Sequence, residues 1–297
     1  MQVQQPWRLH SGTISRAFLP PSHLRQHLVC VIERDTRACL LHPLQGFTYG
    51  PATPNMSITW LWQGHTERLL DWHPDNLDAP REQLKASILI RGGTTKPWIT
   101  YSSEPLHALI AVFRPNALHH LLGLEPSAWI DHIQPLNHTK LEPTWLDWAQ
   151  QILATQNSTA ALPLLYGGLE SQLAPNSVTG AHPELANRWL TRLQNHAQDK
   201  SQRTLQRRIK QLTGTTARQI ERFIRFEQLG LLISSKFNQQ HSQLQQADLA
   251  ASTGFSDQSH MAREVKRVLG FSVGEGLRRL LLHESFWLYR TKLRLHR

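Results

Sequence analysis

Two stretches of the sequence, 201–214 and 257–270, carry cationic and amide side chains at the same spacing. Shifted by 56 positions, they read SQRTLQRRIKQLTG and DQSHMAREVKRVLG. Four positions are identical, namely Gln202/Gln258, Arg207/Arg263, Lys210/Lys266 and Gly214/Gly270. Guanidinium, ammonium and amide groups form hydrogen bonds with anionic oxygens and with the polar edges of nucleic-acid bases. The repeat therefore predicts two copies of one binding element.

Each stretch is predicted to be a short helix with a narrow apolar seam, because apolar residues recur at i, i+4 and i+7. Ser201 and Asp257 favour an N-cap, and Gly214 and Gly270 stand where a helix commonly ends. Projected at about 100° per residue, the side opposite the seam carries Arg203, Gln206, Arg207 and Lys210 in the first helix and Ser259, Ala262, Arg263 and Lys266 in the second. Two ordinary surface helices would show the same period, but they would not explain the matched basic residues.

The positive charge of the chain is concentrated in its C-terminal part. The full sequence has a formal net charge of +10. Residues 1–181 contain 12 Lys and Arg against 13 Asp and Glu, a balance of −1, whereas residues 182–297 contain 20 against 9, a balance of +11. This excess indicates a polyanionic partner, with double-stranded DNA as the leading candidate. An anionic membrane is disfavoured, since no long helix pairs a basic face with an apolar face rich in Trp or Phe.

Length and composition indicate two folded domains. The chain has 297 residues, a hydrophobic fraction of 40% and 10 tryptophans, which suffices for two cores. The segment APNSVTGAHP at 174–183 is typical of a linker, so we expect a β-rich domain ending in helices over 1–181 and a helical DNA-binding domain over 182–297. No apolar run is long enough to span a bilayer and the start lacks the apolar core of a signal peptide, so we expect a cytoplasmic protein.

The first domain is predicted to consist of short strands followed by helices. Brief apolar runs between Pro, Gly and Asn clusters predict strands, and these runs are VCVIER (29–34), ACLLHPL (38–44), SITWLW (57–62), SILIRG (87–92) and HALIAVF (107–113). Helices are predicted at 115–124, 144–155 and 160–173. We expect a small β-barrel or sandwich here and an α+β fold overall. Trp60 and Trp62 alternate along one run, so both indoles should lie on one face and pack in a core.

The second domain is predicted to be all-helical. Besides the repeated helices, the pattern predicts helices over 184–198, 216–234, 244–252 and 272–282. Leu249 and Ala250 supply an apolar and then a small residue where two helices would cross closely. Gly254 accepts the left-handed backbone of a turn, and Phe255 fills the junction. These residues predict a helix-turn-helix unit whose next helix presents its outer face to a DNA major groove.

The segment LAASTGFSDQSHMAREVKRVLGFS resembles the second helix-turn-helix unit of AraC/XylS-type transcription regulators, and SQRTLQRRIKQLTG resembles the reading helix of their first unit. In that family, two such units joined by a long helix enter successive major grooves. The resemblance implies base-reading positions at Arg203, Gln206, Arg207, Gln258, Ser259, His260 and Arg263. Gln258 and His260 follow from the resemblance alone. Lys210 and Lys266 are expected to contact phosphates. The first unit departs from the family, because Gln194 and Gln198 replace its small crossing residue and turn glycine.

Two N-terminal segments, FLPPSHLRQHLVCVIE and ALIAVFRPNALHHLLGL, resemble the sensor domain of some of these regulators, which is similar to a cupin-type barrel followed by helices. The resemblance implies a sequence-specific transcription regulator, either activator or repressor. It also implies that the N-terminal domain senses a small-molecule effector or forms a homodimer, and it allows a contact with RNA polymerase. No cofactor is expected.

A metal-dependent cupin-like enzyme with a helical appendage is the alternative. The sequence has 17 histidines, and histidine is a common metal ligand. However, there is no H-x-H followed by a suitably spaced Glu, no H-E-x-x-H and no paired C-x-x-C. His119 and His120 are adjacent and cannot share one face of a helix. Cys30 and Cys39 are expected to be free thiols. We therefore expect neither catalytic residues nor a metal site.

Overall fold

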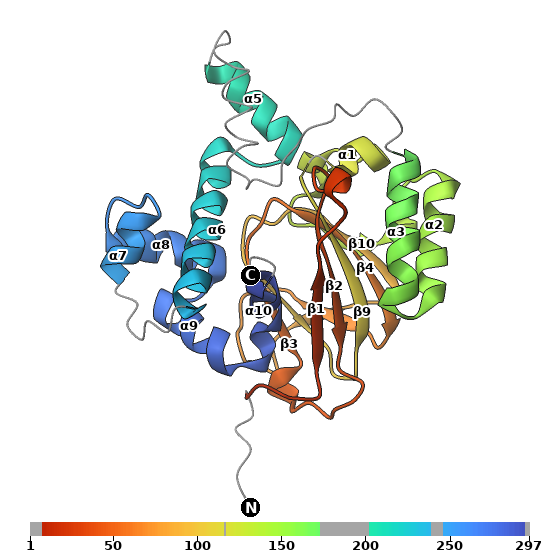
Figure 1. The fold of residues 1–297 in the computed structure, drawn as a ribbon, viewed down its shortest axis with the longest axis horizontal. Coiled ribbons are helices and arrows are strands. Elements are labelled where there is room, and N and C mark those ends of the chain that lie inside the picture. Colours follow the sequence, from red (N-terminus) through yellow and green to blue (C-terminus); the bar gives the residue numbers. More distant parts are fainter. Residues whose placement is uncertain (1–7, 116, 173–201, 239–245, 295–297) are drawn as a thin grey trace, which may run out of the picture.

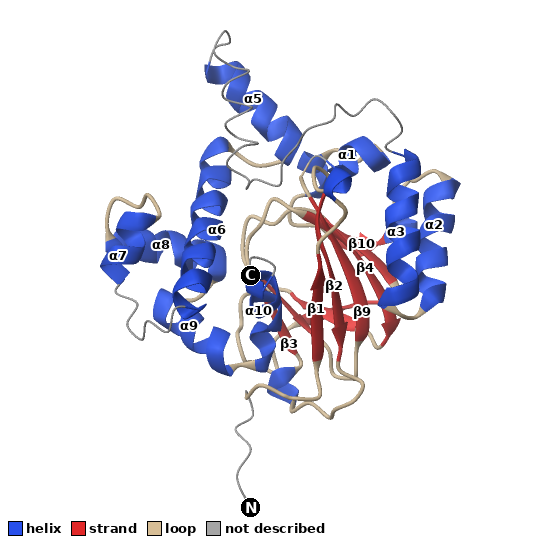
Figure 2. Ribbon diagram, viewed as in Figure 1, coloured by secondary structure: helices blue, strands red, loops and turns tan. Residues whose placement is uncertain are grey.

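The chain folds into a β-rich N-terminal part and a helical C-terminal part that pack against each other (Figure 1). The computed structural model describes residues 8–115, 117–172, 202–238 and 246–294. Two antiparallel sheets face each other, and helices cover the outer face of the larger sheet (Figure 2). The predicted α+β class is confirmed. In the described part of the chain the two sheets form a sandwich and are not hydrogen-bonded into a closed barrel.

The two sheets contain six and four strands, in the orders β1-β2-β9-β4-β7-β10 and β3-β8-β5-β6. The strands are β1 Ile14–Phe18, β2 Leu28–Asp35, β3 Phe47–Gly50, β4 Met56–Gln63, β5 Thr66–Leu69, β6 Arg81–Leu84, β7 Ile88–Arg91, β8 Trp98–Tyr101, β9 His107–Phe113 and β10 Ile133–Pro135. Successive side chains of a strand face opposite sides. In β2, Arg34 therefore faces the space between the sheets, whereas Glu33 faces the covering helices.

Three helices follow in the N-terminal part, close to their predicted positions: α1 Ala117–Leu122, α2 Pro143–Thr155 and α3 Ser158–Gln172. α2 and α3 pack on the six-stranded sheet and share its main hydrophobic cluster. The indole N–H of Trp60 donates to the Ala149 carbonyl (2.9 Å), and that of Trp62 donates to the Ile152 carbonyl (3.3 Å). Both indoles therefore face α2, and their predicted packing role is confirmed.

The C-terminal part is helical in every described element. Its helices are α5 Gln202–Thr213, α6 Ala217–Asn238, α7 Gln246–Ser252, α8 Gln258–Leu269, α9 Val273–Leu282 and α10 Trp287–Arg294. Capping residues set several of their ends. Asp257 and Ser272 accept hydrogen bonds from the first turns of α8 and α9, and Thr216 and Gln219 form the predicted capping box at α6.

Residues 38–44, which the sequence predicts as a strand, instead form a connection that runs into the 3₁₀ turn η2 Pro43–Gln45. Leu40 is 90% exposed there. Pro43 has no N–H to donate to a sheet and begins the turn, so local apolar character misleads at this point. The apolar runs also fail to reveal β1, β3, β5, β6, β8 and β10, which are three to five residues long. The linker predicted at 174–183 and the helix predicted at 184–198 lie outside the described residues.

The helical part docks on the four-stranded sheet through a hydrophobic cluster that both parts share. Phe47 and Tyr49 of β3 belong to it, together with Phe271 and Phe286 from the helical part. The Tyr49 ring lies 5.4 Å from the Phe271 ring and 5.5 Å from the Phe286 ring, centroid to centroid. Full burial of such a side chain contributes about 1.5–3 kcal/mol. Apolar burial therefore supplies much of the attraction between the two parts.

Candidate nucleic-acid interface and interior cavity

The α7–α8 pair forms a helix-turn-helix unit whose turn matches its sequence signals. Leu249 and Ala250 of α7 are buried where the helices cross. Gly254 has a φ of +71°, the left-handed conformation predicted for it. The Phe255 N–H donates to the Ala250 carbonyl (3.2 Å), and the residue is only 7% exposed, so its ring fills the junction. The predicted second unit is confirmed in these details.

Both ends of α8 are held by specific hydrogen bonds. The Asp257 carboxylate accepts from the N–H of His260 (2.7 Å). This bond, together with one from Ser256, holds the pKa of Asp257 below its ordinary value. At the other end, Gly270 has a φ of +82°, and its N–H donates to the Lys266 carbonyl (2.8 Å). These hydrogen bonds therefore fix where α8 begins and where it ends.

The outer face of α8 is open to solvent in the complete chain. The seam residues Met261, Val265 and Val268 are buried beneath it, as predicted. The opposite side and the first turn carry exposed polar residues of the predicted set, Gln258, Ser259, Arg263 and Lys266. Since these side chains are exposed while the helical part is docked on the sandwich, docking leaves this face available to a partner.

His260 differs from the other predicted reading residues because it also supports the turn. Its Nδ1 accepts a hydrogen bond from the Ser256 N–H (3.3 Å). Its ring stands edge-on to Phe255, with 5.6 Å between centroids. A ring nitrogen that accepts from a backbone N–H carries no proton, so neutral His260 bears its proton on Nε2. His260 can therefore offer one N–H donor while it buttresses the junction.

α5 repeats the division into a buried and an exposed side. Ile209 is buried, and the predicted contact residues on α5 are all exposed, namely Arg203, Gln206, Arg207 and Lys210. The predicted N-cap Ser201 lies outside the described residues. α6 packs against both α5 and α8. A single long helix thus joins the two helices with matched basic faces, as the sequence resemblance implies.

Both of these helices end at a glycine that lies against the sandwich, a contact that sequence reasoning misses. At Gly214, which has a φ of +71°, an added Cβ would come within 2.7 Å of the Ile130 side chain. α5 also packs on the 3₁₀ turn η3 Pro126–Trp129. At Gly270, an added Cβ would overlap the indole of Trp72. The repeated glycines therefore end the helices and also allow close contact with the N-terminal part.

The predicted set omits one cation on α8, Arg267, whose side chain is 57% exposed. A residue four positions after Arg263 lies about 40° further around a helix, so projection alone could have included it. The sequence suggests instead an ordinary i,i+3 ion pair with Glu264. Arg208 on α5 is also exposed and outside the predicted set.

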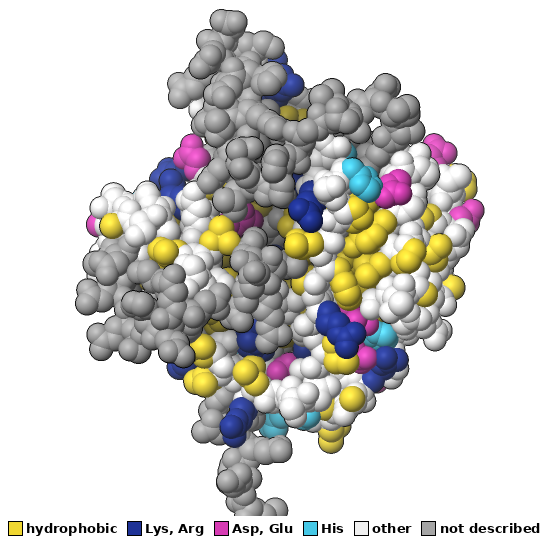
Figure 3. Space-filling model, viewed as in Figure 1, with side chains coloured by type: hydrophobic (Ala, Val, Ile, Leu, Met, Phe, Trp, Pro, Cys, Tyr) yellow, Lys and Arg dark blue, Asp and Glu magenta, His cyan; other side chains and the backbone are white. Residues whose placement is uncertain are grey.

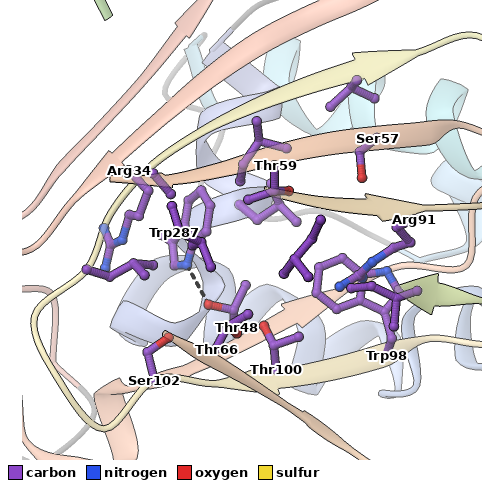
Figure 4. Close-up of a pocket in the computed structure, with 18 of the residues that line it drawn as sticks. Arg34, Thr48, Ser57, Thr59, Thr66, Arg91, Trp98, Thr100, Ser102 and Trp287 are labelled. Carbon is purple, nitrogen blue, oxygen red and sulfur yellow. Dashed lines mark hydrogen bonds between the residues drawn. The ribbon is translucent and has the colours of Figure 1, made fainter. Parts of the chain in front are cut away.

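A cavity of about 110 Å³ lies between the two sheets and is closed on one side by α10 (Figure 4). Its walls are mostly apolar, with hydroxyl groups distributed among them from Thr48, Ser57, Thr59, Thr66, Thr100 and Ser102. From α10, the residues Trp287, Leu288 and Lys292 complete the lining. The Trp287 indole N–H donates to the Thr48 hydroxyl (3.0 Å). The cavity is therefore bounded by both parts of the chain.

Arg91, at the end of β7, lines this cavity and has no acidic partner among the described residues. Its guanidinium lies over the Trp98 ring, 3.5 Å from the centroid. Its NH1 atom is buried and has no hydrogen-bond partner in the described part of the chain. Burial, helped by the nearby charge of Arg68, lowers the pKa of Arg91 to about 9. The geometry suits an anionic group, which would supply the missing acceptor and counter-charge.

Arg34, a second cation in the cavity wall, is already neutralised by the helical part. The carboxylate of Glu284, in the 3₁₀ turn η5 Glu284–Phe286, accepts from the Arg34 NH2 (2.7 Å) and from the Thr13 hydroxyl (2.9 Å). The His10 N–H also donates to it (3.0 Å). Glu284 is 2% exposed, so this ion pair joins the N-terminal strand region to the segment before α10.

A second charged junction joins α9 to the sandwich. Arg279 is 6% exposed and forms ion pairs with Asp75, in the loop after β5, and with Glu275 one turn back. The Tyr49 hydroxyl donates to Asp75 (2.9 Å). Burial and the charge of Arg279 lower the pKa of the adjacent His283 to about 4. This junction is therefore built from groups whose charge depends on pH.

In the residues that the structure describes, no group of three or more His, Cys, Asp or Glu side chains is placed to hold a metal ion. Cys30 and Cys39 are free thiols, as predicted. No helix within the same described ranges is long and apolar enough to cross a membrane.

Comparisons with known proteins place the helical part in a family. Residues 197–279 match the family model of a helix-turn-helix domain. The chain is similar to an apo variant of ToxT from Vibrio cholerae, at 11% identity and a TM-score of 0.37, covering 92% of this chain and 99% of that chain. It is also similar to unsaturated fatty acid bound wild-type ToxT (9%, 0.32, 80% and 94%) and to the AraC-like transcriptional activator CuxR (14%, 0.28, 77% and 86%). No curated protein sequence matches the chain.

The family match and the exposed basic face of α8 define a helix-turn-helix DNA-binding protein. The domain is of the AraC type, as the sequence resemblance predicts.

Proposed function

We propose that this regulator binds double-stranded DNA by inserting α8 into one major groove and α5 into a neighbouring one. The observation that carries the proposal is the capped α8 with a complete turn before it and an exposed outer face. Arg263 on this face would make a bidentate contact with guanine, and Lys266 would bind a phosphate. Gln258, Ser259 and His260 would read neighbouring base edges. On α5, Arg203, Gln206 and Arg207 would read bases, and Lys210 would contact a phosphate.

The test is selection of bound fragments from a genomic library, followed by titration of the selected duplex over a salt range. With 6–10 phosphate contacts, affinity should fall by about 10³ or more between 50 and 200 mM salt. A scrambled duplex of the same length should bind more weakly at every salt concentration. A chain that enriches no fragment, and whose DNA affinity does not change with salt, would overturn the proposal.

The cavity between the sheets is proposed as the site of a small-molecule effector. ToxT, to which the chain is distantly similar, has been solved with an unsaturated fatty acid bound. In this chain the support comes from the cavity itself. Arg91 offers a donor beside apolar walls that has no partner among the residues the structure describes. A single water needs about 10–15 Å³, so a cavity of about 110 Å³ suits a compact organic anion better than a long acyl chain.

An occupant of this cavity would touch both parts of the chain, because Trp287 and Lys292 of α10 line it together with the sheets. A ligand can shift a conformational equilibrium only if it binds the two states with different affinity. Contacts with α10 exist only while the helical part is docked. Binding of the anion should therefore favour the docked arrangement.

Thermal denaturation of the full chain with small aromatic or short-chain carboxylates would test this site, with the matching neutral amides as controls. We expect a carboxylate to raise Tm and the amide not to do so. Arg91→Met, which keeps an unbranched side chain, should abolish the shift, whereas Arg37→Met at an exposed ion pair should retain it. No shift with any carboxylate, or an equal shift with Arg91→Met, would remove the effector site from the proposal.

We propose a cytoplasmic regulator without enzymatic activity, divided into domains 1–181 and 182–297. A homodimer would use the sandwich, where Figure 3 shows hydrophobic side chains gathered beside α3. Leu164 on α3 is 39% exposed. Light scattering on the full chain tests the dimer, and reconstituted transcription tests a contact with RNA polymerase.

The alternative, a metal-dependent enzyme, would be favoured instead by near-stoichiometric iron, zinc or nickel in the purified protein.

A further inference from the structure

Glu264 is a buried carboxylate on α8, the helix whose exposed side is basic. It lies in α8 directly after Arg263 and is 5% exposed. A buried carboxylate is unfavourable unless it is paired and hydrogen-bonded. Its place between the buried seam and the exposed face of α8 means that its partners determine how that face is oriented.

Both oxygens of Glu264 are engaged by arginines from two different helices. Nε of Arg222, on α6, donates to Oε2. NH1 of Arg267, on α8, donates to Oε1 (2.6 Å). The side chain of Arg222 is 16% exposed and that of Arg267 is 57% exposed. The Glu264 carboxylate thus links α8 to α6 through Arg222, and it holds the exposed guanidinium of Arg267 on the outer side of α8.

The charge arrangement makes Glu264 necessary for both contacts. Burial alone would raise its pKa, but the hydrogen bonds and charges of Arg222 and Arg267 hold the pKa below its ordinary value. Without this carboxylate, Arg222 would lose its ion-pair acceptor within the structure and would repel Arg267. Two cations share one anion, so the cluster keeps a net positive charge on the side that faces outward.

The exposed member of the cluster lies where a DNA strand would pass. Arg267 is on the outer side of α8, one turn after Arg263 and next to Lys266. In helix-turn-helix docking, the N-terminal part of the reading helix meets base edges. Residues further along the helix lie beside the sugar–phosphate backbone, where a held guanidinium binds a phosphate with less loss of side-chain freedom.

The buried member of the cluster fixes the angle between helices. Arg222 lies in the second turn of α6, close to the end of α6 that follows α5. α6 packs on both α5 and α8. An ionic tie between Arg222 and Glu264 therefore acts on the geometry of the two helices that would enter successive grooves.

We propose that Glu264 is a positioning residue for DNA reading, and that Arg267, held by it, is a further phosphate contact. The inference rests on the proposed function, since it assigns roles within the same interface. Glu264 aligns α8 on α6 through Arg222, so it determines how well a cognate sequence is distinguished from others. Arg267 adds affinity for all sequences alike.

Glu264→Gln in the full chain separates a positioning residue from a carboxylate that merely repels DNA. If Glu264 only repelled DNA, its removal would tighten binding to every duplex. If Glu264 positions α8, its removal should change the affinity for a cognate duplex more than the affinity for a scrambled one. We expect cognate affinity to fall roughly tenfold relative to a scrambled duplex, the factor that corresponds to about 1.4 kcal/mol. Arg222→Gln should show the same loss, and the double variant should lose little more, since both remove one contact.

Arg267→Ala should lower the slope of log K against log salt by about one unit and weaken cognate and scrambled duplexes equally. Arg267→Lys should restore the slope. Arg37→Ala, at an exposed ion pair on the sandwich, is the matched control and should change neither quantity.

The outcomes separate this inference from the proposed function. A wild-type chain without salt-dependent DNA binding refutes the proposed function itself. If the wild type binds DNA but Arg267→Ala leaves the slope unchanged, Arg267 is no phosphate contact. If Glu264→Gln binds both duplexes more tightly at an unchanged ratio, Glu264 is not a positioning residue. A lowered Tm with an unchanged cognate-to-scrambled ratio likewise assigns it a purely structural role.

Discussion

α5 and α8 share three residue identities and each is followed by a glycine against the sandwich, but what precedes them differs. Before α8, Ala250, Gly254 and Phe255 form a compact turn. Before α5, the corresponding positions are Gln194 and Gln198, which lie outside the described residues. The orientation of α8 is therefore determined by its own unit together with the Glu264 contact. Among the described residues, α5 is in contact with α6 and η3.

The difference suggests that one unit supplies specificity and the other mostly affinity. Base reading requires side chains placed within a fraction of an ångström, whereas phosphate contacts tolerate more variation. A helix held at both ends and tied through Arg222 meets the first requirement. A helix positioned by its neighbours meets the second.

Gly270→Ala should be the most damaging substitution of a glycine in the helical part. A left-handed backbone costs a non-glycine residue about 1–2 kcal/mol, and the added Cβ would overlap the Trp72 indole, for about 1–3 kcal/mol more. Gly254→Ala is the control, because its φ is also positive but its Cβ would meet nothing within 4 Å. Urea unfolding of both variants measures the difference. Equal losses would show that Trp72 moves aside easily and that the close contact at the end of α8 is unimportant.

Acid should weaken the α9 side of the docking surface before the α5 side. The pKa of His283 is about 4 in the folded chain and about 6.5 when unfolded. Between these values the unfolded state binds a proton that the folded state does not, so stability falls as pH drops from 6.5 toward 4. The pKa of Glu275 is lowered to about 2, first by its hydrogen bond with Arg278. Its contribution is present above about pH 4.3 and is lost as pH falls toward 2.

The α5 contact offers a comparison, since the Gly214 backbone and the Ile130 side chain do not titrate. Hydrogen exchange from pH 7 to 4.5 should show rising exchange in α9 and η5 while the Gly214 region changes less, after correction for intrinsic rates. For His283→Gln, the stability lost between pH 6.5 and 4.5, about 1–3 kcal/mol in the wild type, should be much smaller. Equal pH dependence in the variant would show that His283 does not cause the loss.

Arg263→Ala should affect base preference more than Arg207→Ala does, although the two arginines are equivalent in the repeat. We expect Arg263→Ala to reduce the free energy of DNA binding by about 1–3 kcal/mol, mainly through one base position, as a bidentate arginine–guanine contact requires. Arg207→Ala should reduce the binding free energy less, and more uniformly across sequences. Titration of each variant against the cognate duplex and its single-base changes measures both quantities. The reverse ranking would show that α5 is the more specific reader.

Local sequence signals predicted the second unit better than any other part of the chain. Asp257, Gly270 and Gly254 each act within a few residues, so the turn and both ends of α8 could be located from sequence. The strands were harder. Leu40 lies in an apolar run that resembles a strand yet is exposed. The short strands β5 and β6 are defined by their pairing with each other and, for β5, with β8.

The contacts that position the candidate sites could not be predicted because they join residues far apart in the chain. Glu264 pairs with Arg222 across 42 positions, and Trp72 meets Gly270 across nearly 200. Arg91 shows the same limit in the cavity. Its sequence context is an ordinary strand end, and only the fold places it over Trp98, with no acidic partner in the described part of the chain.

Lys266→Ala should produce the smallest effect and the most uniform one. Lys266 and Lys210 are equivalent in the repeat, and both are exposed on helices beside predicted reading residues. An ammonium group that binds phosphate contributes through counterion release, which does not depend on sequence. Lys266→Ala should therefore lower the salt slope by about one unit and leave the ratio between cognate and scrambled duplex unchanged. Lys210→Ala should do the same, because a phosphate contact demands little precision and is insensitive to how firmly its helix is held. If Lys210→Ala leaves the slope unchanged while Lys266→Ala lowers it, α5 does not reach the DNA, and the two helices differ in engagement as well as in precision.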